Sequence, residues 1–326
     1  ETLLQLVHLY FTSPRKDKDA FESYKTRQKQ LYANLGADPQ IFFNVEFQKL
    51  MTQNHPRGGG IPKPENFDQI NLDRSQQIYK ERFANAADFT FLFVGALNEA
   101  TLKPLLEKYI GSLPALPKKE NFKDLGIRPP YRMVDTVFLK GSEPQSQVNM
   151  VFTGPAVFNP TDQYALVSLG ELMSIKLVEK LREEKGSVYG VGAYGSMAKL
   201  PYPNTSFTIS FPCAPENVDS LSRAAIEELK KIMEQGVATA DLEKVKEQQK
   251  RKLEVDLKQN NFWMNSLYEA YFNGNNPADI SRKLKMYEQL SSKMIQDAAR
   301  KYINLNQYIR AVLKPEQNGD KTLKPF

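Results

Sequence analysis

Histidine is the residue on which most zinc and triad chemistry depends, and this chain contains only His8 and His55. They stand far apart, and neither has a second His or Cys near it in the sequence. A zinc site built mainly from His and Cys is therefore impossible within this chain, and a Ser-His-Asp triad could be drawn only around one of these two residues. The apolar helical run around His8 predicts a packed or boundary histidine. His55, which precedes Pro56, is predicted to be an exposed turn residue.

Arg182 and Tyr189 are two further residues that could take part in catalysis. They lie in the stretch Leu-Arg-Glu-Glu-Lys-Gly-Ser-Val-Tyr-Gly-Val. The pattern predicts that a helix ends with Arg182 in its last turns, that Gly186 caps it, and that Tyr189 stands on the following strand. A structural reading accounts for both residues, because a cation is favoured near a helix C-terminus and Tyr is a good strand former. Local physics alone therefore favours structural roles for this pair.

Three other features invite chemical readings, and in each case the structural reading is favoured. The triple glycine at 58–60 is followed by no Gly-Lys-Ser/Thr and opens no helix, so it is predicted to be a plain loop. Cys213 is a lone thiol beside Pro212 with no neighbouring His, so it is predicted to be structural. The acids at 241, 243 and 247 open a helix, where they suit the helix dipole.

A run of large side chains at helical spacing follows near residue 260. These residues could line a peptide-binding chamber, but packing in a core or between domains is favoured. They are Phe262, Trp263, Met264, Tyr268, Tyr271 and Phe272.

Composition excludes several classes of protein. Of 326 residues, 41% are hydrophobic and 25% charged, which is ordinary for a soluble globular protein and unlike a disordered, collagen-like or disulfide-scaffold chain. The net charge of +6 (44 Lys+Arg against 38 Asp+Glu) is mild, and the basic stretch 244–252 is interleaved with Glu, which predicts a solvated helix face with i,i+4 pairs. No nucleic-acid motif is present, and the longest apolar run, 89–97, is far too short to span a membrane. The sequence therefore predicts no nucleic-acid partner and no membrane span.

The first 125 residues read as helices that lead to one strand. Residues 113–131 contain four prolines among charged residues and are the best candidate for a linker. Because the chain begins mid-pattern at Glu1 without an initiator Met, we expect a fragment of a longer protein. The predicted helices cover 2–11, 19–35, 39–53, 72–84 and 98–110, and the predicted strand covers 89–95.

The second segment begins with strands and has no regular βαβ alternation. This order predicts an α+β fold with mostly antiparallel sheets, each covered by helices on one face. Strands are expected at 133–140, 146–154, 188–198, 205–211 and 308–313, and helices at 162–184, 218–235, 239–260, 261–273 and 291–302.

An ordered set of motifs resembles the C-terminal half of the pitrilysin/insulinase-type zinc metallopeptidases. Arg182 and Tyr189, across a helix-Gly-strand turn, are similar to that family's Arg/Tyr pair. The stretches at 143–148, 169–173 and 181–183 frame the pair as in the family, and 91–95 with 105–114 resembles the closing strand and helix of another family domain.

The resemblance implies a specific fold and function. It implies domains similar to LuxS and the processing peptidases, in a clamshell of two halves around a chamber for unfolded peptides. The N-terminal half of such proteins binds zinc, whereas the C-terminal half binds no metal. By this resemblance, Arg182 would hydrogen-bond a substrate carbonyl and Tyr189 would donate to the oxyanion of the tetrahedral intermediate.

The chain departs from a complete enzyme of this family because it has no zinc motif. The resemblance therefore implies that residues 1–125 are the back portion of a degenerate third domain and that residues 126–326 are a complete fourth domain. The chain would be inactive alone. Its partners would be the N-terminal half of the same polypeptide, which would bind the zinc, and a peptide substrate. The resemblance also implies a location in a bacterial periplasm.

Two other functions stay open on the sequence. The chain could be a catalytically silent recognition or structural subunit, similar to the non-catalytic partner of a processing peptidase. It could also be an unrelated α+β binding module whose charged helix faces recruit a protein. An intact Arg/Tyr pair favours the peptidase.

Overall fold

The computed structural model describes residues 1–117, 120–185 and 190–316, with the backbone alone for 181–185. The chain forms two compact units and passes between them more than once. Unit 1 comprises Glu1–Asn34, Pro62–Lys123 and Leu253–Lys283, and unit 2 comprises Leu35–Ile61, Asp124–Lys252 and the chain from Leu284 on. One change of unit falls at Asp124, within the proline-rich segment 113–131. The assignment of 1–125 and 126–326 to two family domains stays a prediction.

Unit 1 is helical in its described part. An aromatic cluster stabilises it, in which the ring of Phe11 lies 4.8 to 5.9 Å from those of Phe83, Phe89 and Phe91. Asn71 and Asn98 cap two of its helices by accepting hydrogen bonds from backbone N–H groups. Its helices are α1 (Thr2–Thr12), α2 (Lys18–Leu35), α4 (Leu72–Phe83), α5 (Glu99–Tyr109) and α9 (Asn260–Asn273).

The strand predicted over 89–95 is absent, and this prediction was wrong. The β-forming residues are there, but a strand requires a hydrogen-bonded partner, and no other segment of unit 1 in the described ranges is a strand. Phe89 and Phe91 pack against Phe11 instead. Contacts between aromatic rings thus take the place of strand pairing in this segment.

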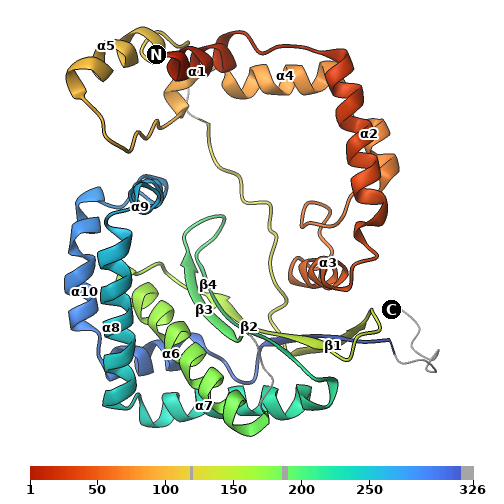
Figure 1. Ribbon diagram of the computed structural model, residues 1–326, viewed down its shortest axis with the longest axis vertical. Helices are drawn as coiled ribbons and strands as arrows, with labels where there is room; N and C mark the ends of the chain where they lie inside the picture. Colours follow the sequence, from red (N-terminus) through yellow and green to blue (C-terminus); the bar gives the residue numbers. More distant parts are fainter. Residues whose placement is uncertain (118–119, 186–189, 317–326) are drawn as a thin grey trace. The chain divides into compact units, whose positions relative to one another are not determined.

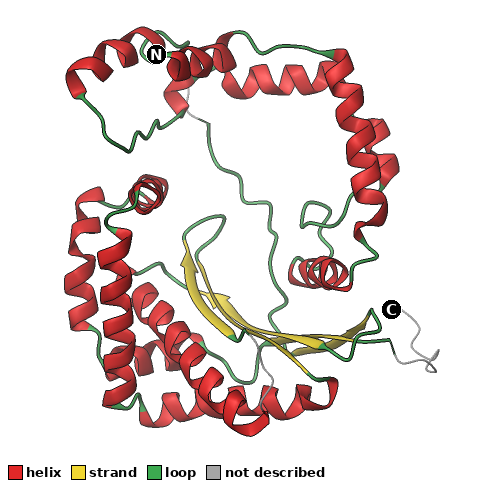
Figure 2. Cartoon of the chain, viewed as in Figure 1, coloured by secondary structure: helices red, strands yellow, loops and turns green. Residues whose placement is uncertain are grey.

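Unit 2 contains one five-stranded mixed sheet (Figures 1 and 2). The strand order is β1-β5-β2-β4-β3; β1 pairs with β5 in parallel, and the other three pairings are antiparallel. The described residues therefore hold one sheet with one parallel pairing, where the sequence predicted mostly antiparallel sheets. The strands are β1 (Val134–Leu139), β2 (Ser146–Pro155), β3 (Gly192–Ala198), β4 (Asn204–Cys213) and β5 (Ile309–Lys314).

The main core lies between one face of the sheet and helices α6 (Pro160–Lys185), α7 (Val218–Gln235) and α11 (Ser292–Tyr302). Alternate residues of β2 and β4 point toward these helices and are nearly inaccessible to solvent, as the period of two in a strand requires. They are Val148, Met150, Phe152, Phe207, Ile209 and Phe211.

The opposite face of the sheet is also covered in part, which corrects the prediction of helices on one face only. Helix α3 (Pro39–Met51) packs there, and its Phe43 is fully buried with Ala311 and Leu313 of β5 (Figure 1). Phe138 of β1 meets the Phe43 ring at 6.0 Å. The apolar side chains on this face of β5 are therefore removed from water by a second helix, α3.

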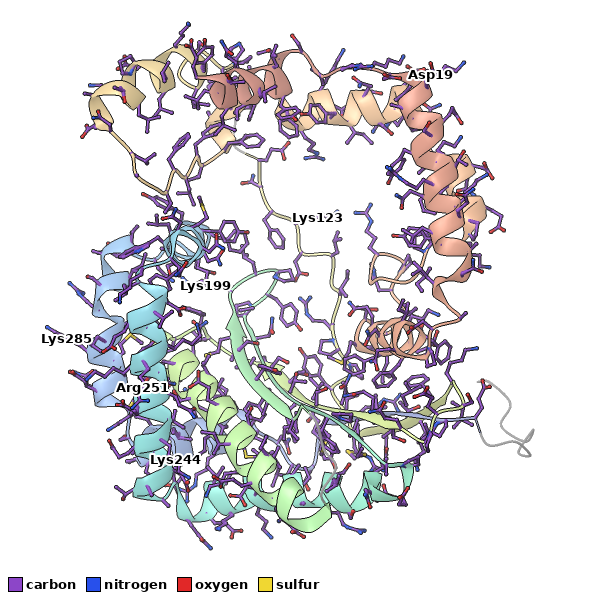
Figure 3. All side chains as sticks on the ribbon, viewed as in Figure 1. Asp19, Lys123, Lys199, Lys244, Arg251 and Lys285 are labelled. Atoms are coloured by element: carbon purple, nitrogen blue, oxygen red, sulfur yellow. The ribbon has the colours of Figure 1, made fainter. Side chains whose placement is uncertain are left out.

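Helix α8 (Thr239–Asp256) ends four residues before the predicted end of its helix, and α10 (Lys283–Gln289) was not predicted. The basic face predicted at 244–252 is confirmed: Lys244 and Arg251, labelled in Figure 3, bond with Glu179 (3.2 Å) and Glu247 (2.7 Å). Short 3-10 helices cover Pro64–Gln69, Ala86–Asp88, Pro215–Asn217 and Pro277–Arg282. Within the described ranges, no helix combines the length and the apolar composition needed to cross a bilayer.

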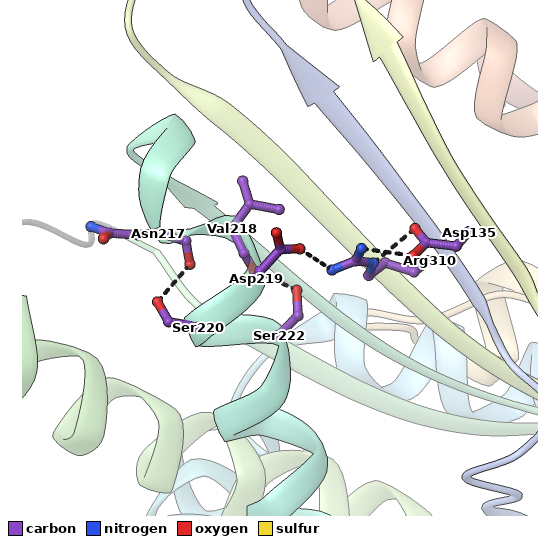
Figure 4. Close-up of polar contacts among 7 residues, drawn as sticks. All are labelled: Asp135, Asn217, Val218, Asp219, Ser220, Ser222 and Arg310. Carbon is purple, nitrogen blue, oxygen red and sulfur yellow. Dashed lines mark hydrogen bonds and ion pairs between the residues drawn. The ribbon is translucent and has the colours of Figure 1, made fainter.

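Arg310 ties three elements of unit 2 together (Figure 4). Its guanidinium, on β5, donates to both carboxylate oxygens of Asp135 on β1 at 2.8 and 2.7 Å, and to Asp219 in the first turn of α7 at 2.7 Å. The hydrogen bond from Arg310 holds the pKa of Asp219 below its usual range. This bidentate geometry makes the contact directional as well as attractive.

A buried polar network joins α6 to α8. The Gln249 amide donates to Ser168 Oγ at 3.0 Å and to Glu171 Oε2 at 2.5 Å, and it accepts from the Tyr164 hydroxyl at 2.6 Å. Gln249, Ser168 and Tyr164 are each less than 9% exposed. Burial raises the pKa of Glu171, while the Gln249 bond and the Lys252 charge oppose that shift. Polar groups buried together in this way specify how the two helices align.

Ser146 is the exception to the pairing of buried polar groups. It is 1% exposed, and its hydroxyl is the one buried side-chain polar atom in the described ranges without a hydrogen-bond partner. An unsatisfied buried hydroxyl is destabilising.

We expect Ser146→Ala to raise the free energy of unfolding by about 1 kcal/mol, because it removes this unsatisfied group at little loss of volume. Urea unfolding followed by circular dichroism measures the change. The matched control is Ser168→Ala, which removes an equally buried hydroxyl that is bonded to Gln249 and should lower stability. A loss of stability in Ser146→Ala would contradict the assignment.

Glu171 should make stability depend on pH. Below the usual Glu pKa of 4.5, the carboxyl is protonated in both states. The pKa of Glu171 is higher in the folded state than in the unfolded state. As the pH rises between these two pKa values, the unfolded state releases its proton first, so the free energy of unfolding falls. Glu171→Gln, which can still accept from Gln249, should flatten this decline.

Urea unfolding at a series of pH values from about 4 to 7 measures this slope for the wild type and for Glu171→Gln. Glu179→Gln is the control, because Glu179 lies on the same helix with its side chain 46% exposed. If both variants change the slope equally, burial of Glu171 is not the cause.

Candidate functional site

The predicted pair falls largely outside the described residues. Arg182 lies within helix α6, as predicted, but its side chain is outside the description. Tyr189 lies outside the described residues altogether. The strand expected from residue 188 is described from Gly192 on. The structure therefore describes the two elements that flank the pair, α6 and β3, and both site assignments stay predictions.

Helix α6 and strand β3 approach each other at backbone distance. A Cβ atom added to Gly170 of α6 would lie 2.7 Å from the Ala193 carbonyl oxygen, and one added to Gly195 of β3 would lie 2.2 Å from the Leu166 carbonyl oxygen. Both are closer than real Cβ contacts, and the atoms that would have to move belong to the backbone. Only glycine fits at these two positions.

Ser174 links the same two elements by hydrogen bonds. Its Oγ lies one helical turn beyond Gly170, accepts a hydrogen bond from the Ala193 N–H at 2.8 Å, and donates to the Gly170 carbonyl at 2.9 Å. Ala193 is 3% exposed, so its N–H needs a protein partner. Ser174 was not among the residues predicted from the sequence. The i,i+4 spacing of Gly170 and Ser174, two small residues on one helix face, was the available signal.

Helix α6 is also held from its other side. Lys176 forms an ion pair with Asp241 of α8, whose side chain is 10% exposed, in addition to the Gln249 network. Asp241 opens α8, as the dipole argument predicted. The helix that carries Arg182 is thus fixed by contacts on two sides.

The two histidines have structural roles in this chain. His8 is half-buried with its Nδ1 2.9 Å from the Tyr109 carbonyl oxygen, which confirms a boundary histidine. His55 is also half-buried, not exposed as predicted, because its Nδ1 accepts a hydrogen bond from the Arg57 N–H at 3.1 Å and turns the ring toward the chain. No group of three or more His, Cys, Asp or Glu that could hold a metal ion occurs among the described residues. The donor set present there does not fit a zinc ion.

The remaining candidates have mixed outcomes. Cys213 is buried, and burial raises the pKa of its thiol to about 11, which confirms an unreactive cysteine. The segment 58–60 is a loop, as predicted. Three of the aromatics on α9 do not pack in a core: Tyr268, Tyr271 and Phe272 are 55 to 57% exposed, because the buried stripe of this helix passes through Ser266 and Ala270. Packing of these residues between domains stays a prediction.

Known proteins align with most of the length of this chain. A zinc protease PQQL-like protein of Arabidopsis thaliana is 22% identical over 353 residues, which cover 98% of this chain and 36% of that protein. The probable zinc protease PqqL of Haemophilus influenzae is 22% identical over 300 residues, covering 91% and 31%. This chain spans about a third of the length of these relatives.

Solved structures share the fold. The periplasmic protease PqqL from Escherichia coli superposes with a TM-score of 0.81 at 19% identity, over 96% of this chain and 34% of that one. The first half of the same protease superposes with a TM-score of 0.75 at 15% identity, over 98% and 71%. At these identities the likeness concerns the fold alone.

A family model extends the comparison to the sequence itself. The model described as the peptidase M16 inactive domain matches residues 69–249, more than half of the chain. The match runs through parts of both compact units and includes all of α6 and β3. This chain therefore belongs to the peptidase M16 family, as an inactive domain of that family.

Proposed function

We propose that this chain is the C-terminal, non-zinc part of a zinc-dependent endopeptidase that hydrolyses peptides in an enclosed chamber. The observation that carries the proposal is the match of residues 69–249 to the peptidase M16 inactive domain. Relatives named as zinc proteases align with nearly the whole chain and support it. Because the described donors do not fit zinc, the chain would be inactive alone and would depend on metal held elsewhere.

In this proposal, Arg182 and Tyr189 act on the substrate. Arg182 would donate a hydrogen bond to a substrate carbonyl, and Tyr189 would donate to the oxyanion that forms as the peptide bond is attacked. Such donors contribute because they stabilise charge that develops in the transition state. The zinc, bound in the missing half, would activate the attacking water.

The proposed partners are the N-terminal half of the same polypeptide and a peptide substrate. This chain superposes on 34% of the full-length E. coli PqqL and on 71% of the first half of that protease, which supports a protein built from two related halves. We further propose a periplasmic location in a bacterium, because the E. coli neighbour is named a periplasmic protease.

A catalytically silent recognition or structural subunit is the second candidate. The family description, an inactive domain, is what favours it. The two candidates differ in whether the phenol of Tyr189 contributes to catalysis, because a silent subunit stabilises no oxyanion.

Cleavage of a quenched fluorescent peptide by the full-length gene product tests the proposal. We expect cleavage to be abolished by a zinc chelator and restored by zinc. Tyr189→Phe should cleave roughly 100-fold more slowly, which is the usual loss when one oxyanion donor is removed.

The matched control is Tyr194→Phe, which removes a 68% exposed phenol from β3 of the same chain and should leave the rate unchanged. An active wild type with an equally fast Tyr189→Phe would retain the enzyme class and reject the site. A folded, zinc-supplemented protein that cuts no peptide would favour the silent subunit.

A further inference from the structure

We propose that Ser174 is a positioning residue for the segment that carries Arg182 and Tyr189, through its hydrogen bond with Ala193. This inference rests on the proposed function. It assigns a role to a residue that contacts neither substrate nor metal and that acts through the junction between α6 and β3.

The junction is defined by three contacts among described residues. The Gly170 and Gly195 contacts bring the backbones of α6 and β3 together. The Ser174 hydroxyl then accepts from the Ala193 N–H at 2.8 Å, and lies 3.4 Å from the Ala193 carbonyl oxygen. The glycines permit the approach, whereas the hydroxyl selects one position of Ala193 along the helix. A hydrogen bond is directional, and apolar contact alone is not.

The position of this bond in the chain is what gives it a role in the site. Arg182 follows Ser174 by eight residues along the same helix, about 12 Å of helical rise. Tyr189 precedes Ala193 by four residues, which span at most about 14 Å of chain. The bond therefore closes a loop of sequence that contains both proposed donors. Within the described residues of that loop, no further hydrogen bond joins α6 to β3.

The rate of the proposed reaction depends on how accurately the two donors are placed. A donor stabilises an oxyanion only within a narrow range of distances, and displacement of a positioned group by about 1 Å can reduce the rate by about 100-fold. Without the Ser174 hydroxyl, the buried Ala193 N–H would have to find another partner, and the start of β3 would shift along α6. The donors would then be misplaced while the substrate could still bind.

The fold should survive the loss of this hydroxyl. The core contacts of α6 come from Leu166, Leu169 and Leu172, each fully buried, and these are unchanged in Ser174→Ala. A suitable control is Ser222→Ala on α7, because the Ser222 hydroxyl is also bonded within a helix, to the Val218 carbonyl at 2.7 Å, but to no strand.

The test is steady-state peptide cleavage by the full-length protein, with Tm measured for each variant. We expect Ser174→Ala to lower kcat about 10-fold with KM changed less than about 2-fold. Ser222→Ala should lower Tm by a similar amount and leave kcat unchanged. In a Tyr189→Phe background, Ser174→Ala should lower kcat by a smaller factor than it does in the wild type, because part of its effect acts through the hydroxyl already removed.

The outcomes separate the inference from the proposed function. If Tyr189→Phe is slow but Ser174→Ala has normal kcat, the inference fails and the proposed function stands. If Ser174→Ala and Ser222→Ala slow the enzyme equally, or if the Ser174 and Tyr189 effects multiply fully, Ser174 is structural only. An inactive or Tyr189-independent wild type defeats the proposed function first.

Discussion

The backbone contact between α6 and β3 is the constraint on which unit 2 depends. A side chain at position 170 or 195 would overlap backbone atoms, so the helix and the strand lie this close only because both residues are glycine. This contact sets the distance of α6 from the sheet and so determines which of its side chains reach the core. Leu166, Leu169 and Leu172 are then fully buried in the same core as the inward residues of β2 and β4.

The polar contacts of α6 add direction to this apolar packing. Apolar side chains tolerate small shifts along a helix, whereas a buried hydrogen bond that is broken leaves an unsatisfied group. Ser174 bonds to β3, and Gln249 bonds to Ser168 and Glu171 from the side of α8. The middle of α6 is thus fixed by interactions that permit one register on each side. A helix held in this way can carry a side chain whose position matters.

Periodicity predicted most elements well, and its failures have physical causes. The amphipathic pattern of 218–235 matched α7 at both ends, because a helix that packs on a sheet must present one apolar stripe. The strand predicted at 89–95 does not form, because β propensity cannot supply a partner strand. The helix at 39–53 was predicted, but its position on the second face of the sheet was not, because burial there depends on β5, far along the chain. Arg182 and Tyr189 were predicted as site residues from the resemblance to a peptidase family. Ser174 was not predicted because the i,i+4 spacing of Gly170 and Ser174 marks a helix face with small residues but does not identify the partner, the backbone N–H of Ala193.

An inactive domain and a contribution to catalysis are compatible in physical terms. Activation of water requires a metal and its ligands, and the described residues of this chain, with His8 and His55 engaged in backbone hydrogen bonds, do not provide them. Stabilisation of a transition state requires only donors held at the right place. A domain without metal can therefore still raise the rate, provided that its scaffold is rigid where the donors attach. In this fold, the glycine contact and the buried hydrogen bonds hold the part of α6 that precedes residue 181.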